Sequence, residues 1–173
     1  KAAQYPSNAD VFIIAVPTPF KTNNSEIPEP EIKFVLEAAE AISKVIKKGD
    51  LVILESTSPI GTTEEVHNLI LTKSNLGIND FFVAHCPERV LPGKILVELI
   101  QNDRVIGGTS KVAAEKAKIF YEIFCKGEIH TTSSKLAELV KLSENAYRDV
   151  NVAFANELSL VCDKENIDIR ELV

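Results

Sequence analysis

The sequence predicts an α/β protein in which a parallel sheet is followed by one long helix. Three short apolar runs predict buried strands at residues 10–16, 51–54 and 80–84. Segments in which apolar residues recur with helical spacing separate these runs, at residues 31–48 and 63–72. Strands that alternate with helices in this way indicate right-handed βαβ units, and therefore a parallel sheet.

The composition is that of an ordinary globular chain of 173 residues, 45% of them hydrophobic. A net charge of −6 without a basic cluster argues against nucleic acid or an anionic membrane surface as a partner. No apolar run approaches the roughly 20 residues that a membrane helix needs. The three cysteines lack metal-ligand spacing, so no metal site is predicted, and they favour a reducing, cytoplasmic setting. Because the chain contains no methionine, we expect it to be a piece of a larger protein.

Each of the first three predicted strands ends in a polar or proline-rich loop. These loops are Pro17–Pro19, Ser56–Ser58 and His85–Arg89. In an open parallel sheet the carboxyl ends of the strands share one edge, and ligands bind there. A helix that starts near Thr62 or Thr63 would add free amides that attract negative charge. We therefore expect the three loops to line one crevice.

The chain after these loops continues the α/β pattern. Residues 95–99 fit either a helical turn or an edge strand, and residues 104–108 form a fourth predicted strand. A predicted helix at residues 111–124 then precedes a possible strand at residues 128–131.

The last predicted element is a helix from Ser134 to about Asn166, which neither Gly nor Pro interrupts. At 1.5 Å per residue it would span about 45 Å, so we expect it to bridge to a second domain or subunit. Lys141, Asn145 and Arg148 recur at i, i+4 and i+7 on one face. An amide between two cations fits an oxyanionic ligand better than a plain solvated face.

Several of these segments resemble the nucleotide-sugar dehydrogenases, the family of UDP-glucose and GDP-mannose dehydrogenases. Val16–Pro19 is similar to the family's cofactor-side loop, Glu55–Thr63 to its "ESTVPVGTT" segment, and Lys141–Asn145 to its Lys…Asn helix. Within the family, three segments look like the version found in enzymes that oxidise UDP-N-acetyl-D-mannosamine: Cys86–Gly93, Asn102–Gly108 and Asn145–Ser159.

The resemblance implies the C-terminal part of a Rossmann-like NAD-binding domain at residues 1–132. Residues 133–173 would then begin an all-α central dimerisation domain. The implied reaction is a four-electron oxidation of the C6 alcohol of a UDP-N-acetylhexosamine by two NAD+, through an aldehyde and a cysteine thioester. The implied partners are the UDP-sugar and a second copy of the chain, bound through the long helix. We expect the family's Gly-rich loop before residue 1, and its nucleophilic cysteine beyond residue 173.

The resemblance also assigns roles to individual residues. Lys141 and Asn145 would face the oxyanion, Glu88 would orient water or act as a base, and Thr57 would hold a water or the nicotinamide side. Predicted cofactor contacts are Val16, Pro17, Thr18, Ser56, Thr57 and Glu88. Predicted substrate contacts are Arg89, Val90, Leu91, Lys141, Asn145 and Arg148. A surface charge or an interface ion pair is an alternative role for Arg148. We assign no chemistry to His85 and Cys86, which flank the predicted site.

Two other functions stay open. Another β-hydroxyacid-type dehydrogenase would share a Rossmann half and a helix with Lys and Asn, but would transfer hydride once and need no cysteine. A non-catalytic α/β binding or assembly module would use the long helix only as a dimer interface. The sequence does not distinguish N-acetylmannosamine from N-acetylglucosamine as the sugar.

Overall fold

The computed structural model describes residues 2–21, 27–90 and 93–172. The chain divides into two compact units, residues 1–141 and 142–173. The strands are β1 (Val11–Ile14), β2 (Leu51–Leu54), β3 (Phe82–His85), β4 (Arg104–Gly108) and β5 (Ile129–Ser133). The helices are α1 (Lys33–Ser43), α2 (Thr62–Lys73), α3 (Ile95–Gln101), α4 (Lys111–Glu122), α5 (Ser134–Glu165) and α6 (Ile169–Leu172). None of the described helices combines the length and the apolar composition that crossing a membrane requires.

The five strands form one sheet in the order β1-β2-β3-β4-β5. Neighbouring strands are parallel except at one pair, since β4 runs antiparallel to β3, with Ala84 opposite Gly108 and His85 opposite Gly107. The prediction of a wholly parallel sheet is therefore wrong at β4. The segment that contains α3 returns the chain to the same edge of the sheet instead of crossing its face, so β4 starts beside the carboxyl end of β3.

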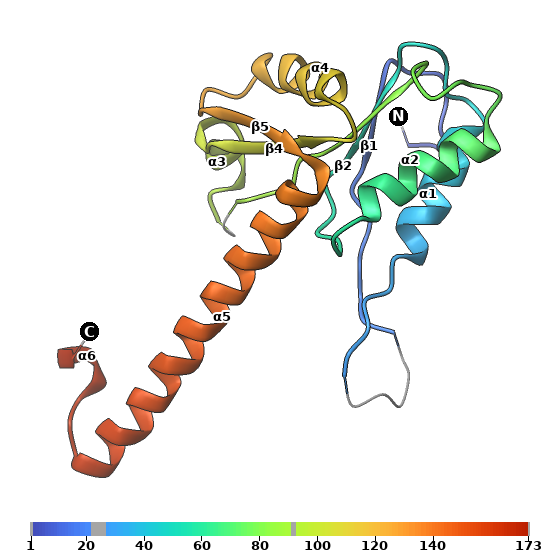
Figure 1. Cartoon of the computed structure of the whole chain (residues 1–173). Coiled ribbons are helices and arrows are strands. Elements are labelled where there is room, and N and C mark those ends of the chain that lie inside the picture. The colour runs from blue at the N-terminus through green and yellow to red at the C-terminus, as the bar shows by residue number, and fades with distance from the viewer. Residues whose placement is uncertain (1, 22–26, 91–92, 173) are drawn as a thin grey trace. The chain divides into compact units, whose positions relative to one another are not determined.

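Helices cover both faces of the sheet in the first unit (Figure 1). On one face, α1 and α2 pack on the first three strands through a core that includes Val35, Val66 and Leu54. On the other face, α4 packs on a second core that includes Ile53 and Tyr121. Alternate residues of β2 thus face opposite cores, as expected for a strand buried on both sides.

Several predicted boundaries differ from those observed, including those of the first strand and the first helix. The first strand ends at Ile14 instead of Val16, because the side chain of Ser56 bonds both the N–H and the carbonyl of Val16 and so ends the ladder. The first helix ends at Ser43, and the chain then turns so that Ile46 still enters the core. Residues 95–99, which fit either a helical turn or an edge strand in the sequence, belong to the helix α3.

The predicted long helix is confirmed as α5, which begins in the first unit and continues into the second. Its first turn packs tightly on β4 at Gly107. A Cβ at Gly107 would lie 2.4 Å from the carbonyl oxygen of Ser133 and 2.6 Å from Cβ of Ala137. Glycine is therefore needed here for the close approach of helix and strand.

Candidate functional site

The loops that follow β1 and β2 are joined by side-chain hydrogen bonds at the carboxyl edge of the sheet. The N–H of Val16 donates to Oγ of Ser56 at 2.8 Å, and the Ser56 hydroxyl donates to the carbonyl of Val16 at 2.7 Å. The hydroxyl of Thr18 donates to the carbonyl of Thr57 at 2.7 Å. Pro17 lies between these contacts and is exposed. The structure thus brings together five of the predicted cofactor contacts, from two loops.

A third loop continues from β3 and contains Glu88, Arg89 and Val90. The carboxylate of Glu88 is exposed and accepts a hydrogen bond from the N–H of Val90. Arg89 donates to the carbonyl of Asp103 at 3.2 Å, which holds the loop against the residues before β4. The cavity between this loop and α3 has a volume of only about 10 Å³, so the loop packs on that helix. Leu91, also a predicted substrate contact, lies outside the described residues.

Lys141, Asn145 and Arg148 lie on α5. Their spacing places them along one stripe of the helix, where Lys141 and Asn145 are half-buried and Arg148 is exposed. Lys141 belongs to the first compact unit, whereas Asn145 and Arg148 belong to the second. A crevice that these residues share with Thr57 and Glu88 stays a prediction.

Glu138, which the sequence reasoning missed, connects α5 to the start of α2. Its carboxylate is fully buried and accepts hydrogen bonds from the N–H of Gly61 at 2.6 Å, the N–H of Thr63 at 2.8 Å and the hydroxyl of Thr63 at 2.6 Å. The expectation that the first amides of α2 are free is therefore wrong, because the protein's own carboxylate occupies them. One signal was available: Glu138 precedes Lys141 by three residues and shares its face of the helix.

A buried polar cluster lies beneath the loop that follows β2. The hydroxyl of Tyr121 donates to Glu55, and the guanidinium of Arg104 lies 4.5 Å from the centre of the Tyr121 ring. Arg104 also contacts the sulfur of Cys86 at 3.7 Å. Burial raises the pKa of the Cys86 thiol, although the positive charge of Arg104 opposes that shift. The thiol is therefore neutral near pH 7, which makes Cys86 a poor nucleophile.

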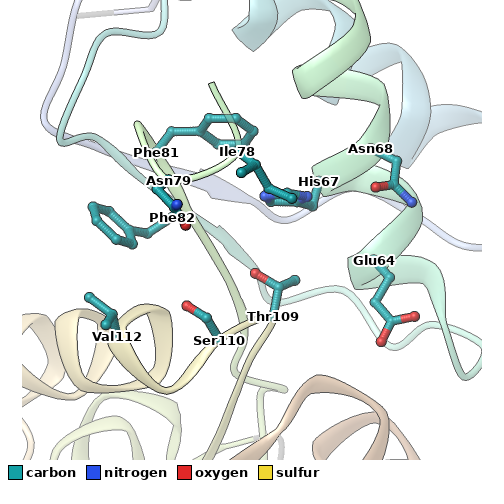
Figure 2. Close-up of a pocket in the computed structure, with 10 residues that line it drawn as sticks. All are labelled: Glu64, His67, Asn68, Ile78, Asn79, Phe81, Phe82, Thr109, Ser110 and Val112. Carbon is teal, nitrogen blue, oxygen red and sulfur yellow. The ribbon is translucent and has the colours of Figure 1, made fainter. Parts of the chain in front are cut away.

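A cavity of about 670 Å³ lies elsewhere in the first unit (Figure 2). Figure 2 shows Glu64 and His67 of α2 on one side, and Ser110 and Val112 at the start of α4 on the other. None of the predicted site residues lines this cavity. No group of three or more His, Cys, Asp or Glu in the described residues could hold a metal ion.

The residues at the carboxyl edge fit one end of NAD. The loops after β1 and β2 offer backbone groups, hydroxyls and the exposed Pro17 ring, and Thr18 and Thr57 are half-buried. These neutral groups suit the nicotinamide and its ribose, and not the charged pyrophosphate. The nearby helix start that would suit a phosphate is occupied by Glu138.

Comparison with known proteins gives one family over most of the chain. Residues 1–125 match the NAD binding domain of the UDP-glucose/GDP-mannose dehydrogenase family, and residues 135–173 match its central domain. A UDP-N-acetyl-D-mannosamine dehydrogenase of Campylobacter jejuni is 51% identical over 100% of this chain and 44% of its own length. An NDP-N-acetyl-D-galactosaminuronic acid dehydrogenase of Ralstonia nicotianae is 47% identical over 100% of this chain and 42% of its own length.

Comparison with solved structures leads to the same family. The solved structure of the UDP-D-ManNAc dehydrogenase of Pyrococcus horikoshii superposes with a TM-score of 0.90 at 42% identity, over 96% of this chain and 39% of that one. The chain thus spans less than half the length of each of these three relatives. Both family domains and relatives of about 50% identity bear out the resemblance of the quoted motifs. The chain belongs to the UDP-glucose/GDP-mannose dehydrogenase family.

Proposed function

We propose that the complete protein oxidises the C6 alcohol of a UDP-N-acetylhexosamine, UDP-N-acetylmannosamine in the first instance, to the uronic acid. The observation that carries this proposal is the alignment of the whole chain, at 51% identity, with a UDP-N-acetyl-D-mannosamine dehydrogenase. The hydrogen-bonded loops at the carboxyl edge of β1 and β2 support it, since ligands of open α/β sheets bind at that edge.

In this proposal the loops after β1 and β2 hold the cofactor. Val16, Pro17 and Thr18 would contact one side of the nicotinamide and ribose, and Ser56 and Thr57 would contact the other. Bound NAD+ would accept the hydride that leaves C6. The bonds between Ser56 and Val16 keep the two loops at a fixed separation, which orients the ring before substrate binds.

The stripe on α5 would bind the reacting oxygen. Loss of hydride requires the C6 alcohol to lose its proton, so negative charge develops on that oxygen. The ammonium of Lys141 and the amide of Asn145 would stabilise this charge, because both are hydrogen-bond donors that lie four residues apart on one helix. The aldehyde would add a cysteine thiol of the complete protein, and a second NAD+ would oxidise the resulting thiohemiacetal to a thioester. Glu88 would orient the water that hydrolyses this thioester, and its exposed carboxylate can accept the proton of that water. Arg89, Val90, Leu91 and Arg148 would contact the UDP-sugar.

The proposal extends to the organisation of the chain. Residues 1–132 would belong to the nucleotide-binding domain and residues 133–173 to the central helical domain of a cytoplasmic homodimer. Exposed apolar side chains on α5 support pairing through this helix, and they include Tyr147, Val150 and Phe154. If Phe154→Glu leaves the complete protein dimeric in sedimentation equilibrium, the helix is not the interface.

The stoichiometry of the reaction tests the proposed function. The complete protein is incubated with excess NAD+ and a limiting amount of UDP-N-acetylmannosamine or UDP-N-acetylglucosamine, and NADH is measured at the end point. We expect two NADH for each molecule of the preferred sugar. One NADH per sugar would instead indicate a simple alcohol dehydrogenase. No NADH with either sugar would overturn the proposal.

A further inference from the structure

Glu138 is a buried carboxylate whose hydrogen bonds join two helices that are far apart in sequence. Oε2 accepts from the N–H of Gly61, and Oε1 accepts from both the N–H and the hydroxyl of Thr63, over 75 to 77 residues of sequence. None of the surface of Glu138 is accessible to solvent. A buried charge is tolerated only when hydrogen bonds replace its water, as they do here.

The position of this carboxylate explains why it is held so firmly. Gly61 is the N-cap of α2 and has no side chain, so the first turn of the helix receives no side-chain cap from this position. Glu138 supplies the missing acceptors and places a negative charge at the positive end of the helix. Displacing the carboxylate would leave both the charge and the two amides without partners, so α5 and α2 are held together at this point.

A second contact holds the same part of α5. The first turn of the helix lies against Gly107 of β4, where a Cβ would come within 2.6 Å of Ala137. Ala137 is fully buried, one residue before Glu138. The start of α5 is therefore fixed from two directions, by the sheet and by α2.

Lys141 lies one helical turn beyond this fixed point. A separation of three residues places Lys141 on the face of α5 that carries Glu138, about 4.5 Å further along the helix axis. Both residues belong to the first compact unit. The contact of Glu138 with α2 therefore sets how far Lys141 stands from the carboxyl edge of the sheet.

We propose that Glu138 is the positioning residue for Lys141: its bonds to Gly61 and Thr63 fix the helix turn from which the ammonium reaches the reacting oxygen. This inference rests on the proposed function, in which Lys141 stabilises that oxygen. Glu138 itself touches neither substrate nor cofactor in this account, because all of its described bonds are to the start of α2.

A double-mutant cycle in the complete protein tests this inference. Glu138→Gln keeps the shape of the side chain but turns an amide N–H toward one of the donors that the carboxylate now accepts from. We expect kcat to fall about tenfold or more while KM for the UDP-sugar changes by less than about threefold, as for a misplaced group that acts in the transition state. In a Lys141→Ala background, measured by single turnover, the same change should lower the rate by less than about twofold.

The control is Lys135→Ala. Lys135 also joins α5 to α2, through a 3.0 Å ion pair with Glu64, but both side chains are exposed. We expect its kinetics to match wild type, since exposed ion pairs contribute little. An equal rate loss from Glu138→Gln with and without Lys141 would overturn the proposal. If Glu138→Gln does not fold, Glu138→Asp, which keeps the charge but shortens its reach, should give the same non-additive pattern.

Amide hydrogen exchange separates this inference from the proposed function. In Glu138→Gln, the amides of Gly61, Thr63 and the α5 turn up to Lys141 should exchange faster than in wild type, with or without catalysis. Unchanged exchange in the α5 turn would refute the positioning role even in an active enzyme. A wild-type protein that reduces no NAD+ would refute the proposed function, and with it the catalytic part of this inference.

Discussion

The hydroxyl of Tyr121 lies 2.5 Å from Oε1 of Glu55, to which it donates a hydrogen bond from α4 to the residue that follows β2. Burial raises the pKa of Tyr121, and the nearby Cys86 and Glu55 raise it further, so the phenol stays a neutral donor. Glu55 directly precedes Ser56 and Thr57, which are predicted to contact the cofactor. The buried cluster around Arg104 thus supports the loop from below.

Tyr121→Phe should destabilise the protein by about 1.5–3 kcal/mol, the usual range for a hydrogen bond to a charged group. The variant keeps the ring that packs against Arg104 but leaves Glu55 without its phenolic donor. Urea unfolding of the complete protein measures the change. Tyr5→Phe is the matched control, because Tyr5 is 73% exposed and lies outside α5, and its unfolding midpoint should not move. Equal midpoints for the two variants would contradict this account.

Ser56→Ala should raise KM for NAD+ several-fold with a smaller effect on KM for the UDP-sugar. Its hydroxyl bonds both backbone groups of Val16, so its removal frees the loop that is predicted to hold the nicotinamide. Initial rates at varied NAD+ give the answer. Thr72→Ala removes an exposed hydroxyl that bonds only Asn68 within α2, and it should leave both constants unchanged. If both variants behave like wild type, Ser56 does not organise the cofactor loop.

Lys141→Ala and Asn145→Ala should each lower kcat by about 10²–10³-fold, the loss typical of removing one oxyanion donor. The reason is that both donors stabilise charge that develops only in the transition state. Steady-state kinetics of the complete protein measure this loss. Lys164→Ala, near the end of α5, is a control for loss of a helix cation. Turnover within a few-fold of wild type in both site variants would remove the role assigned to the stripe.

His85 should make stability fall as the pH is lowered from about 6.5 to about 4. Burial lowers the pKa of His85 to about 4, the carbonyl of Leu54 opposing the shift, so the folded protein holds the neutral ring. The unfolded chain takes up a proton near pH 6.5 while the folded chain does not. The contribution of the neutral His85 ring to the free energy of unfolding is therefore complete above that pH. This contribution is about 3 kcal/mol, and it is lost as the pH falls toward 4.

Urea unfolding between pH 7.5 and 4.5 checks this expectation. His85→Leu should remove most of the slope in this range, because a leucine side chain takes up no proton. His130→Leu serves as the comparison, since the His130 side chain is 55% exposed beside Glu128. Identical pH profiles for wild type and His85→Leu would show that the ring does not control acid stability.

Much of the fold is predictable because the signals are local. The apolar run of β2 and the uninterrupted helical spacing of α5 each contain their own information, and both elements are observed. The direction of β4 in the sheet is not determined by a local sequence signal. Its five residues would look the same in either orientation, and the segment before it is long enough for a crossover. Only the packing of the whole chain decides this choice.

The residues of the candidate site also divide into those that local sequence predicts and those that only the folded chain reveals. Val16, Thr18, Ser56 and Thr57 follow directly from strands that are recognisable in the sequence, and the structure places them in contact. The contact of Glu138 with Thr63 spans 75 residues, and no sequence spacing indicates which amides a distant carboxylate will reach. The role of Glu138 therefore becomes visible only when the chain is folded.

The same contact bears on how the protein can be cut. A fragment that ends at the predicted boundary, between residues 132 and 133, would lack Glu138. The three donors at Gly61 and Thr63 would then lose their acceptor. A recombinant nucleotide-binding half should therefore be extended through Lys141, where the first compact unit ends. A shorter version would expose the start of α2 and the buried surface around Gly107, and it would tend to aggregate.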